Sequence, residues 1–336
     1  MLLTYNNMSL ETKTMKQHIV PKAHIKRFEK NGKIIVHAID ENRNVKYYTS
    51  TAANVCKFVN FYDDDPYAEK SIEKFLKGNE DNGQRGIDNY FKINKIFSPI
   101  DEEFREKNKT DGFRSISVSE MDRMAILKYI SMLFSRSLHS RIVAENLVQT
   151  GQSFGADEKI THSALMKESE NKIMSNDLND MTFMCCTSVN RDFLIADLPV
   201  HLIYLRKPSK LPPLAEFIGK NAMNPAIHEQ KELMKYYMES FTKAHKHNVF
   251  FCPISNAHCL VAYRKDYENF TIDFINFLGP DMVTSINKLV VEQSFFNVYS
   301  GENKTNEIAS ILQYLPPISK EKKELLQKLK KIQKNH

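Results

Sequence analysis

The sequence predicts an α+β fold with short N-terminal antiparallel strands, a long central core helix, and a C-terminal mixed or antiparallel sheet with packing helices. β-rich runs occur near the start of the chain and again after residue 179, with helical periodicity between them. This clustering lacks the regular strand–helix alternation of a parallel sheet. The 336 residues include 10 Gly and 12 Pro, so long flexible linkers are not expected.

The N-terminal strands are predicted from a β-rich run between turn residues. Lys33–Ile39 is that run, with Asn31-Gly32 before it and Asp40–Asn44 after it, and we expect it to pair with Val45–Tyr48. Two helical stretches and a polar surface loop follow, at Asp65–Phe75, Gln84–Ile96 and Asp101–Gly112.

The central helix is predicted over Ser117–Thr150. Ser119 can cap its start, Asp122 lies three residues further on, and a broad apolar face follows. A more polar helix is expected at Lys159–Met174. The C-terminal half is expected to hold strands at Met181–Val189, Phe193–Ala196, Val200–Leu205, Val249–Cys252, Cys259–Tyr263 and Phe295–Tyr299, and helices at His228–Lys246 and Pro280–Val291.

Residues 17–315 are expected to form a single α+β domain, which could divide into a mainly helical lobe (17–178) and a sheet-containing lobe (179–315). Residues 1–16 are expected to be poorly ordered. Residues 316–336 begin with the breaker Pro316-Pro317 and are predicted to form a basic amphipathic helix with seven Lys and two Glu. That helix either docks on its own domain or contacts nucleic acid.

The cysteines indicate a cytoplasmic protein. Their number is odd, five, and none stands in a CxxC pair, so they read as reduced core thiols. We find no signal peptide and no apolar run of about 18 residues, so no membrane partner is expected.

Familiar cofactor and catalytic motifs do not explain the chain. It has neither a Walker A loop nor GxGxxG, so no nucleotide cofactor is expected. Residues 151–155 match GxSxG, but a helix precedes them where a nucleophile elbow needs a strand. A zinc site from Cys252, His258 and Cys259 is disfavoured, because strand alternation sends the adjacent His258 and Cys259 to opposite faces.

Several short motifs occur in a fixed order along the chain. They are Gln-His-Ile-Val-Pro-Lys-Ala-His-Ile-Lys-Arg-Phe at 17–28, Ile-Glu-Lys-Phe-Leu at 72–76 with Glu80, Arg-Ser-Leu-His-Ser-Arg at 136–141, Phe-Leu-Ile-Ala-Asp-Leu-Pro-Val at 193–200 and Phe-Cys-Pro-Ile-Ser at 251–255. Together they resemble the bacterial domain-of-unknown-function family DUF4238, from about His18 to Ser300. The chain departs from the family pattern at Leu198 and His139. Because members of the family look like genes of phage-defence islands, the resemblance implies an antiviral role.

Five residues in these motifs have catalytic chemistry. His18 precedes a Pro-fixed segment, which suits a general base or a metal ligand. An unbroken helix would place Glu73 and Glu80 on one face two turns apart, although Gly78-Asn79 lies between them. Asp197 ends an apolar strand. Arg136, in an apolar helix, needs a carboxylate or a phosphate as its partner, and would share a face with His139.

We therefore expect an anti-phage effector that is a metal-dependent nuclease or phosphodiesterase. His18, Glu73, Asp197 and Arg136 would be catalytic, and Mg²⁺ or Mn²⁺ would be held by Glu73, Glu80 and Asp197. Lys22, His139 and Arg141 would bind the substrate. Two other classes stay open: a non-enzymatic sensor or interaction protein that recognises a phage component, and a hydrolase or transferase acting on a small metabolite. The same residues could also form a buried polar network.

Overall fold

The computed structural model confirms the α+β class. It describes residues 16–59, 61, 71–94, 112–114, 118–138, 140–142, 144, 158–173, 176–188, 191–204, 248–267, 281–318, 323–324 and 326–327. The helix expected at His228–Lys246, the GxSxG match and the first 15 residues lie outside these ranges. No helix within them is long and apolar enough to cross a membrane.

A five-stranded antiparallel sheet forms the centre of the molecule. Its strands are β5 (Gly112–Arg114), β8 (Met181–Thr187), β10 (His201–Tyr204), β11 (Asn248–Ser255) and β12 (His258–Arg264), in the order β10-β11-β12-β8-β5. Every residue of β11 is buried, because helices cover both faces of the sheet. Its near-continuous apolar sequence follows from that position.

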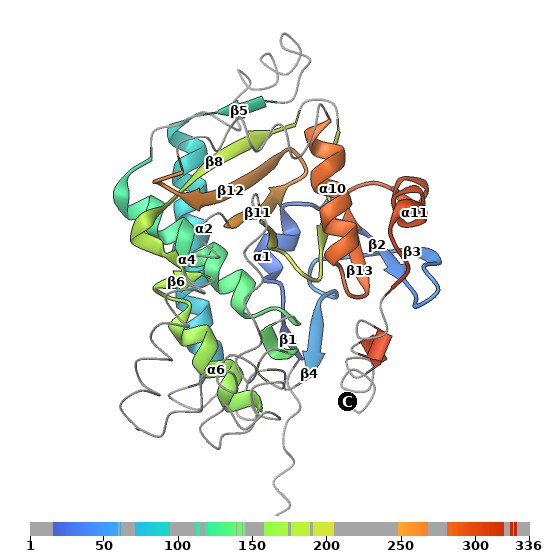
Figure 1. Cartoon of the computed structure of the whole chain (residues 1–336), viewed down its shortest axis with the longest axis horizontal. Coiled ribbons are helices and arrows are strands. Elements are labelled where there is room, and N and C mark those ends of the chain that lie inside the picture. The colour runs from blue at the N-terminus through green and yellow to red at the C-terminus, as the bar shows by residue number, and fades with distance from the viewer. Residues whose placement is uncertain are drawn as a thin grey trace, which may run out of the picture.

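Strand alternation sends side chains of this sheet into two cores. Cys252 and Cys185 belong to a core shared with α2 (Ile72–Ile93) and α4 (Glu120–Ser135), whereas Cys186 and Cys259 belong to one shared with α10 (Met282–Gln293) and α11 (Thr305–Tyr314). Figure 1 shows the resulting layers, with α2 and α4 on one side of β8, β12 and β11 and α10 on the other. All five cysteines are buried and free, as expected.

A second, four-stranded sheet joins the two ends of the chain. Its order is β3-β2-β13-β9, with β2 (Ile34–Ile39), β3 (Val45–Ser50), β9 (Ile195–Ala196) and β13 (Asn297–Ser300). The predicted β2–β3 pair is confirmed, and β2 also pairs with β13. This sheet therefore takes strands from both of the lobes that the sequence suggested. Shorter elements complete the fold: β1 (Lys16–His18), α1 (Lys22–Lys26), β4 (Lys57–Val59), α6 (Glu158–Glu168), β6 (Lys172–Ile173), β7 (Asn176–Asp177) and a 3₁₀ turn at Leu178–Asp180.

Helix α2 corrects the expectation of two separate helical stretches. It runs unbroken through Gly78, so Glu73 and Glu80 lie two turns apart on one helix. Ser71 caps it by accepting a hydrogen bond from the Lys74 backbone N–H at 3.3 Å. Gly83 lets α2 approach α4 closely, because a Cβ there would lie 2.4 Å from the Tyr129 Cβ.

Helix α4 is shorter than the predicted Ser117–Thr150. Ser119 does cap it, accepting from the Asp122 N–H at 3.1 Å, but the helix ends at Ser135 and a turn at Arg136-Ser137 follows. Serine hydroxyls explain the break, because those of Ser135, Ser137 and Ser140 donate to the carbonyls of Met132 and Phe134 and compete with the helical ladder. Arg136 is the C-cap residue of α4 and not part of a helix interior, and the predicted position of His139 on the same face lies outside the described residues.

Beyond Ile318 the C-terminal tail is described at four positions. Leu326 is buried in the core, whereas Lys323, Glu324 and Gln327 are exposed. At this point the tail docks on its own domain through an apolar side chain.

Candidate functional site

His18 lies at the end of β1, where pairing with β4 places it opposite Lys57. Two fully buried residues, Ile19 and Val20, follow and fix the chain before Pro21 and α1. The imidazole is partly buried, and among the described residues its Nε2 atom has no hydrogen-bond partner. Other buried atoms among the described residues share this property, such as His201 Nε2, and a water molecule, an ion or a ligand can complete a position of this kind.

Burial and neighbouring cations keep His18 neutral. Burial lowers its pKa to about 4, with further lowering by Lys57, Arg136 and Lys22, and a backbone hydrogen bond to Ala52 acts in the opposite direction. Since Nε2 has no partner, the ring meets Ala52 through Nδ1. That bond favours a proton on Nδ1 and a lone pair on Nε2.

Arg136 connects the predicted residues to each other. Its side chain is 1% exposed and forms an ion pair with Glu80, which is 24% exposed. The guanidinium also donates to the backbone carbonyl of His18. The partner that the sequence required for Arg136 is thus a carboxylate. His18, Lys22, Lys57, Glu80 and Arg136 are called the His18 cluster below.

Arg141 lies close to this cluster. It is buried, and together with Arg136 it contributes to the low pKa of His162, about 4, which burial mainly causes. Arg136 and Arg141 therefore both place positive charge near His162.

The three carboxylates expected to hold a metal are not gathered in one place. Among the described residues no group of three or more His, Cys, Asp or Glu side chains is arranged to bind an ion. Glu80 is paired with Arg136, and Glu73 lies two turns away, about 10 Å along the helix axis. A single Mg²⁺ needs oxygen ligands at roughly 2.1 Å, and a metal held jointly by Glu73, Glu80 and Asp197 stays a prediction.

The Asp197 carboxylate binds backbone N–H groups of the turn between α10 and β13. It is 2% exposed and accepts hydrogen bonds from the N–H groups of Phe295, Phe296 and Asn297 at 2.8, 2.6 and 3.0 Å. The carboxylate thereby fixes the turn between α10 and β13. These three donors stabilise the buried carboxylate.

A polar cavity of about 120 Å³ lies between Asp197 and the β1–β4 pair. We call it the Tyr48 cavity; it is lined by Ile19, Tyr48, Asn54, Val55, Cys56, Lys57, Phe58, Asp197, Phe296, Asn297 and Tyr299. Cys56 has a positive φ of 55°, which is rare for a residue with a side chain. Its thiol donates to the Tyr299 hydroxyl at 2.9 Å, and burial raises its pKa, so it is not an activated nucleophile.

The Tyr48 cavity adjoins the His18 cluster. Lys57 lines the cavity and also lowers the pKa of His18. The Ile19 N–H donates to the Cys56 carbonyl at 2.9 Å, which holds the two regions together. Sequence reasoning missed Lys57, Tyr48 and Cys56, because the strand register that brings them to His18 has no signature in residue spacing.

His24 was also missed, although it belongs to the first family motif. It is fully buried, and its Nε2 bonds to the Pro253 carbonyl at 2.9 Å while its Nδ1 meets the Tyr129 hydroxyl at 3.1 Å. Burial lowers the pKa of His24 to about 3, and the charge of Arg27 lowers it further. Because His24 and Pro253 stand in the first and last motifs, this bond gives a structural reason for their joint occurrence.

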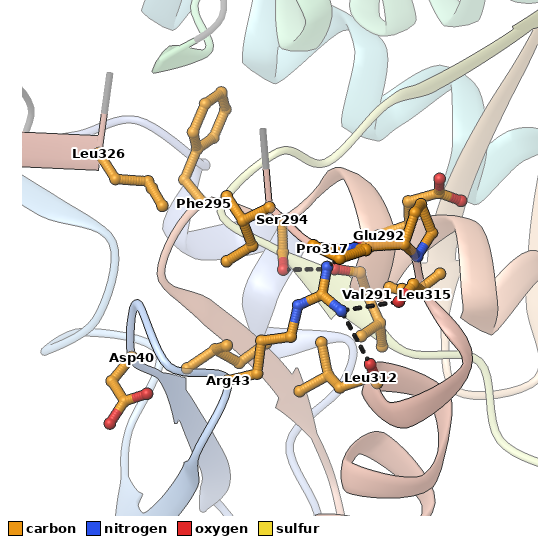
Figure 2. A pocket seen from close by; sticks show the side chains of 13 residues that line it. Asp40, Arg43, Val291, Glu292, Ser294, Phe295, Leu312, Leu315, Pro317 and Leu326 are labelled. Atoms are coloured by element: carbon orange, nitrogen blue, oxygen red, sulfur yellow. Dashed lines mark hydrogen bonds between the residues drawn. The ribbon is translucent and has the colours of Figure 1, made fainter. Parts of the chain in front are cut away.

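A second cavity, of about 190 Å³, lies between the β2–β3 turn, α10, α11 and the tail. Figure 2 shows Arg43 reaching across it, with Leu326 and Phe295 on the far side. Arg43 donates to the carbonyls of Leu312 at 3.1 Å, Leu315 at 2.8 Å and also Pro316. The guanidinium thus satisfies the end of α11, which makes this region a structural joint.

Fold and site together define an α+β protein with a partly buried basic cluster beside a small polar cavity. The chain belongs to the DUF4238 family, described as a protein of unknown function, whose model matches residues 16–304. No curated protein and no solved structure gives a significant match.

Proposed function

We propose that this chain cleaves phosphodiester bonds of nucleic acid at the His18 cluster, as an effector in defence against phage. One observation supports the proposal above all: a neutral imidazole with an unpartnered Nε2, among the described residues, has Lys22, Lys57 and Arg136 around it. Cations around a potential proton acceptor suit a negatively charged substrate.

In this proposal His18 accepts the proton of the attacking water or hydroxyl through Nε2. Without a bound substrate, His18 has a pKa of about 4 and is a weak base. A bound phosphate would offset the charges of Lys57 and Lys22, which add to the effect of burial, and would thereby raise the pKa of His18. Binding of the substrate would therefore make His18 a stronger base.

The assay described below is run with and without a divalent metal. Mg²⁺ is commonly held by one or two carboxylates together with substrate phosphates. A metal held by Glu73, Glu80 and Asp197 stays a prediction, and the role proposed for His18 does not depend on it.

The test compares wild type, His18→Gln and the control His37→Gln for cleavage of labelled RNA and DNA with Mg²⁺, Mn²⁺ or EDTA. His37 is a suitable control because burial lowers its pKa to about 4 as well, while it bonds to Ser300 and Thr305 away from the cluster. We expect His18→Gln to lose at least about 100-fold in rate and His37→Gln to keep wild-type rate. Circular dichroism confirms folding.

Equal activity of folded His18→Gln and wild type would refute the assigned role. If every folded protein is inert, also with phage lysate present, the nuclease is refuted. A non-enzymatic interaction protein is then favoured by the edge strand β3, which displays Tyr47 and Tyr48 at 55% and 53% exposure. Plaque counts on cells expressing His18→Gln separate the two, because a sensor would still protect them.

A further inference from the structure

We propose that the Tyr48 cavity receives one base of a single-stranded nucleic acid, whose neighbouring phosphate then lies at the His18 cluster. This inference rests on the proposed function and names its substrate class. Lys57 carries the connection, because it lines the cavity and also acts electrostatically on His18.

The size of the cavity limits the occupant. Its volume is about 120 Å³, which is enough for a few water molecules or one small planar group. This is well below the roughly 300 Å³ at which pockets for larger ligands begin. A single planar ring system is of the right order, whereas a base pair is not, so a base would have to be unpaired to enter.

The lining matches a base chemically. Asn54 and Asn297 supply amide groups that both donate and accept, as needed to bond the edge of a base. Tyr48, on the exposed strand β3, supplies an aromatic face at the solvent side. Asp197 is the negatively charged member of the lining, and three backbone N–H groups bond its carboxylate.

The cavity walls are held in place before any ligand arrives. The Asp197 bonds fix the start of β13, and the Ile19–Cys56 backbone bond fixes the segment before β4. Cys56 keeps its left-handed conformation while bonded to Tyr299. Such preorganisation lowers the entropy lost on binding and is typical of recognition sites.

The experiment measures binding without cleavage. Fluorescence anisotropy with a labelled single-stranded octanucleotide in EDTA gives Kd for wild type, Tyr48→Ala, Tyr48→Phe and Tyr47→Ala. Tyr47 is the matched control, because it is next in sequence, equally exposed, and does not line the cavity. We expect Tyr48→Ala to weaken binding about tenfold or more, the loss of one base–aromatic stack, with Tyr48→Phe and Tyr47→Ala near wild type.

Duplex of the same sequence should compete poorly. Equal effects of Tyr47→Ala and Tyr48→Ala, equal competition by duplex, or no binding to wild type would overturn the inference. If Tyr48→Ala alone loses binding but wild type never cleaves, the base site stands and the nuclease is refuted. If wild type cleaves and Tyr48→Ala binds normally, the nuclease stands and the base site is refuted.

Discussion

The ion pair between Arg136 and Glu80 can be tested by removing its negative member. Arg136 is 1% exposed, so Glu80→Gln removes a negative charge that is paired with a buried guanidinium. Breaking a buried pair costs roughly 3–5 kcal/mol; because Glu80 is 24% exposed and Gln can still accept a hydrogen bond, we expect about 2–3 kcal/mol. Urea unfolding followed by circular dichroism measures this loss.

Arg136→Met should cost less than Glu80→Gln, since the freed Glu80 can turn toward water while the Met side chain fills the apolar site. In the double variant the losses should not add, leaving a coupling energy of at least about 1 kcal/mol. Arg136→Met should also raise the pKa of His18 measured by NMR, because Arg136 is one of the charges that lower it.

A control comes from the second glutamate that pairs with a buried arginine. Glu120 is 72% exposed beside Arg123, which also bonds to the carbonyls of Leu178 and Met181. Glu120→Gln should leave the urea midpoint nearly unchanged. If Glu80→Gln is as mild as this control, or if the Glu80 and Arg136 effects are additive, Arg136 does not depend on the pair in the way described.

Two further predictions concern the helices and the buried histidines. Gly78→Ala should stabilise the protein by about 0.5–1 kcal/mol, because a Cβ there meets no atom within 4 Å; Gly83→Ala should destabilise it by about 3 kcal/mol or more, since its Cβ would overlap Tyr129. Thermal unfolding measures both, and shifts of equal sign would contradict the packing of α2 on α4. Burial lowers the pKa of His24 to about 3 and of His201 to about 4, so the unfolded chain binds protons below about pH 6.5 while the folded chain does not. Stability is therefore full above pH 6.5, and this pair lowers it by roughly 3 kcal/mol per pH unit between 6 and 4.5. A urea midpoint that stays constant from pH 7.5 to 5 would refute this. His201→Gln should lower the measured slope by about 1.4 kcal/mol per pH unit, and the rest of the slope stays because His18, His37 and His162 also have pKa values of about 4.

Local signals in the sequence predicted much of the fold. Turn residues around Lys33–Ile39 and the cap at Ser119 were read correctly, because both depend on neighbouring residues. The early end of α4 also has a local cause. The hydroxyls of Ser135, Ser137 and Ser140 bond to backbone carbonyls and compete with the hydrogen bonds of the helix.

The candidate site could be predicted only in part, because its contacts join distant segments. The sequence indicated that Arg136 needs an anionic partner, but the choice of Glu80 follows from the packing of α4 on α2, 56 positions apart. Asp197 ends a strand as expected, yet the three N–H groups that it binds belong to a turn about 100 positions away. No spacing rule connects such residues.

The pairing of β2 with β13 has a consequence for synthesis of the chain. His37 bonds to Ser300, 263 positions further on, and a ribosome adding about 5–20 residues per second needs between about ten seconds and a minute to cover that interval. Throughout this time the edge of β2 that will receive β13 lacks its strand, and unpaired strand edges attract other chains. Protection of that edge, by a chaperone or by speed of translation, is therefore part of what a cell must provide to make this protein.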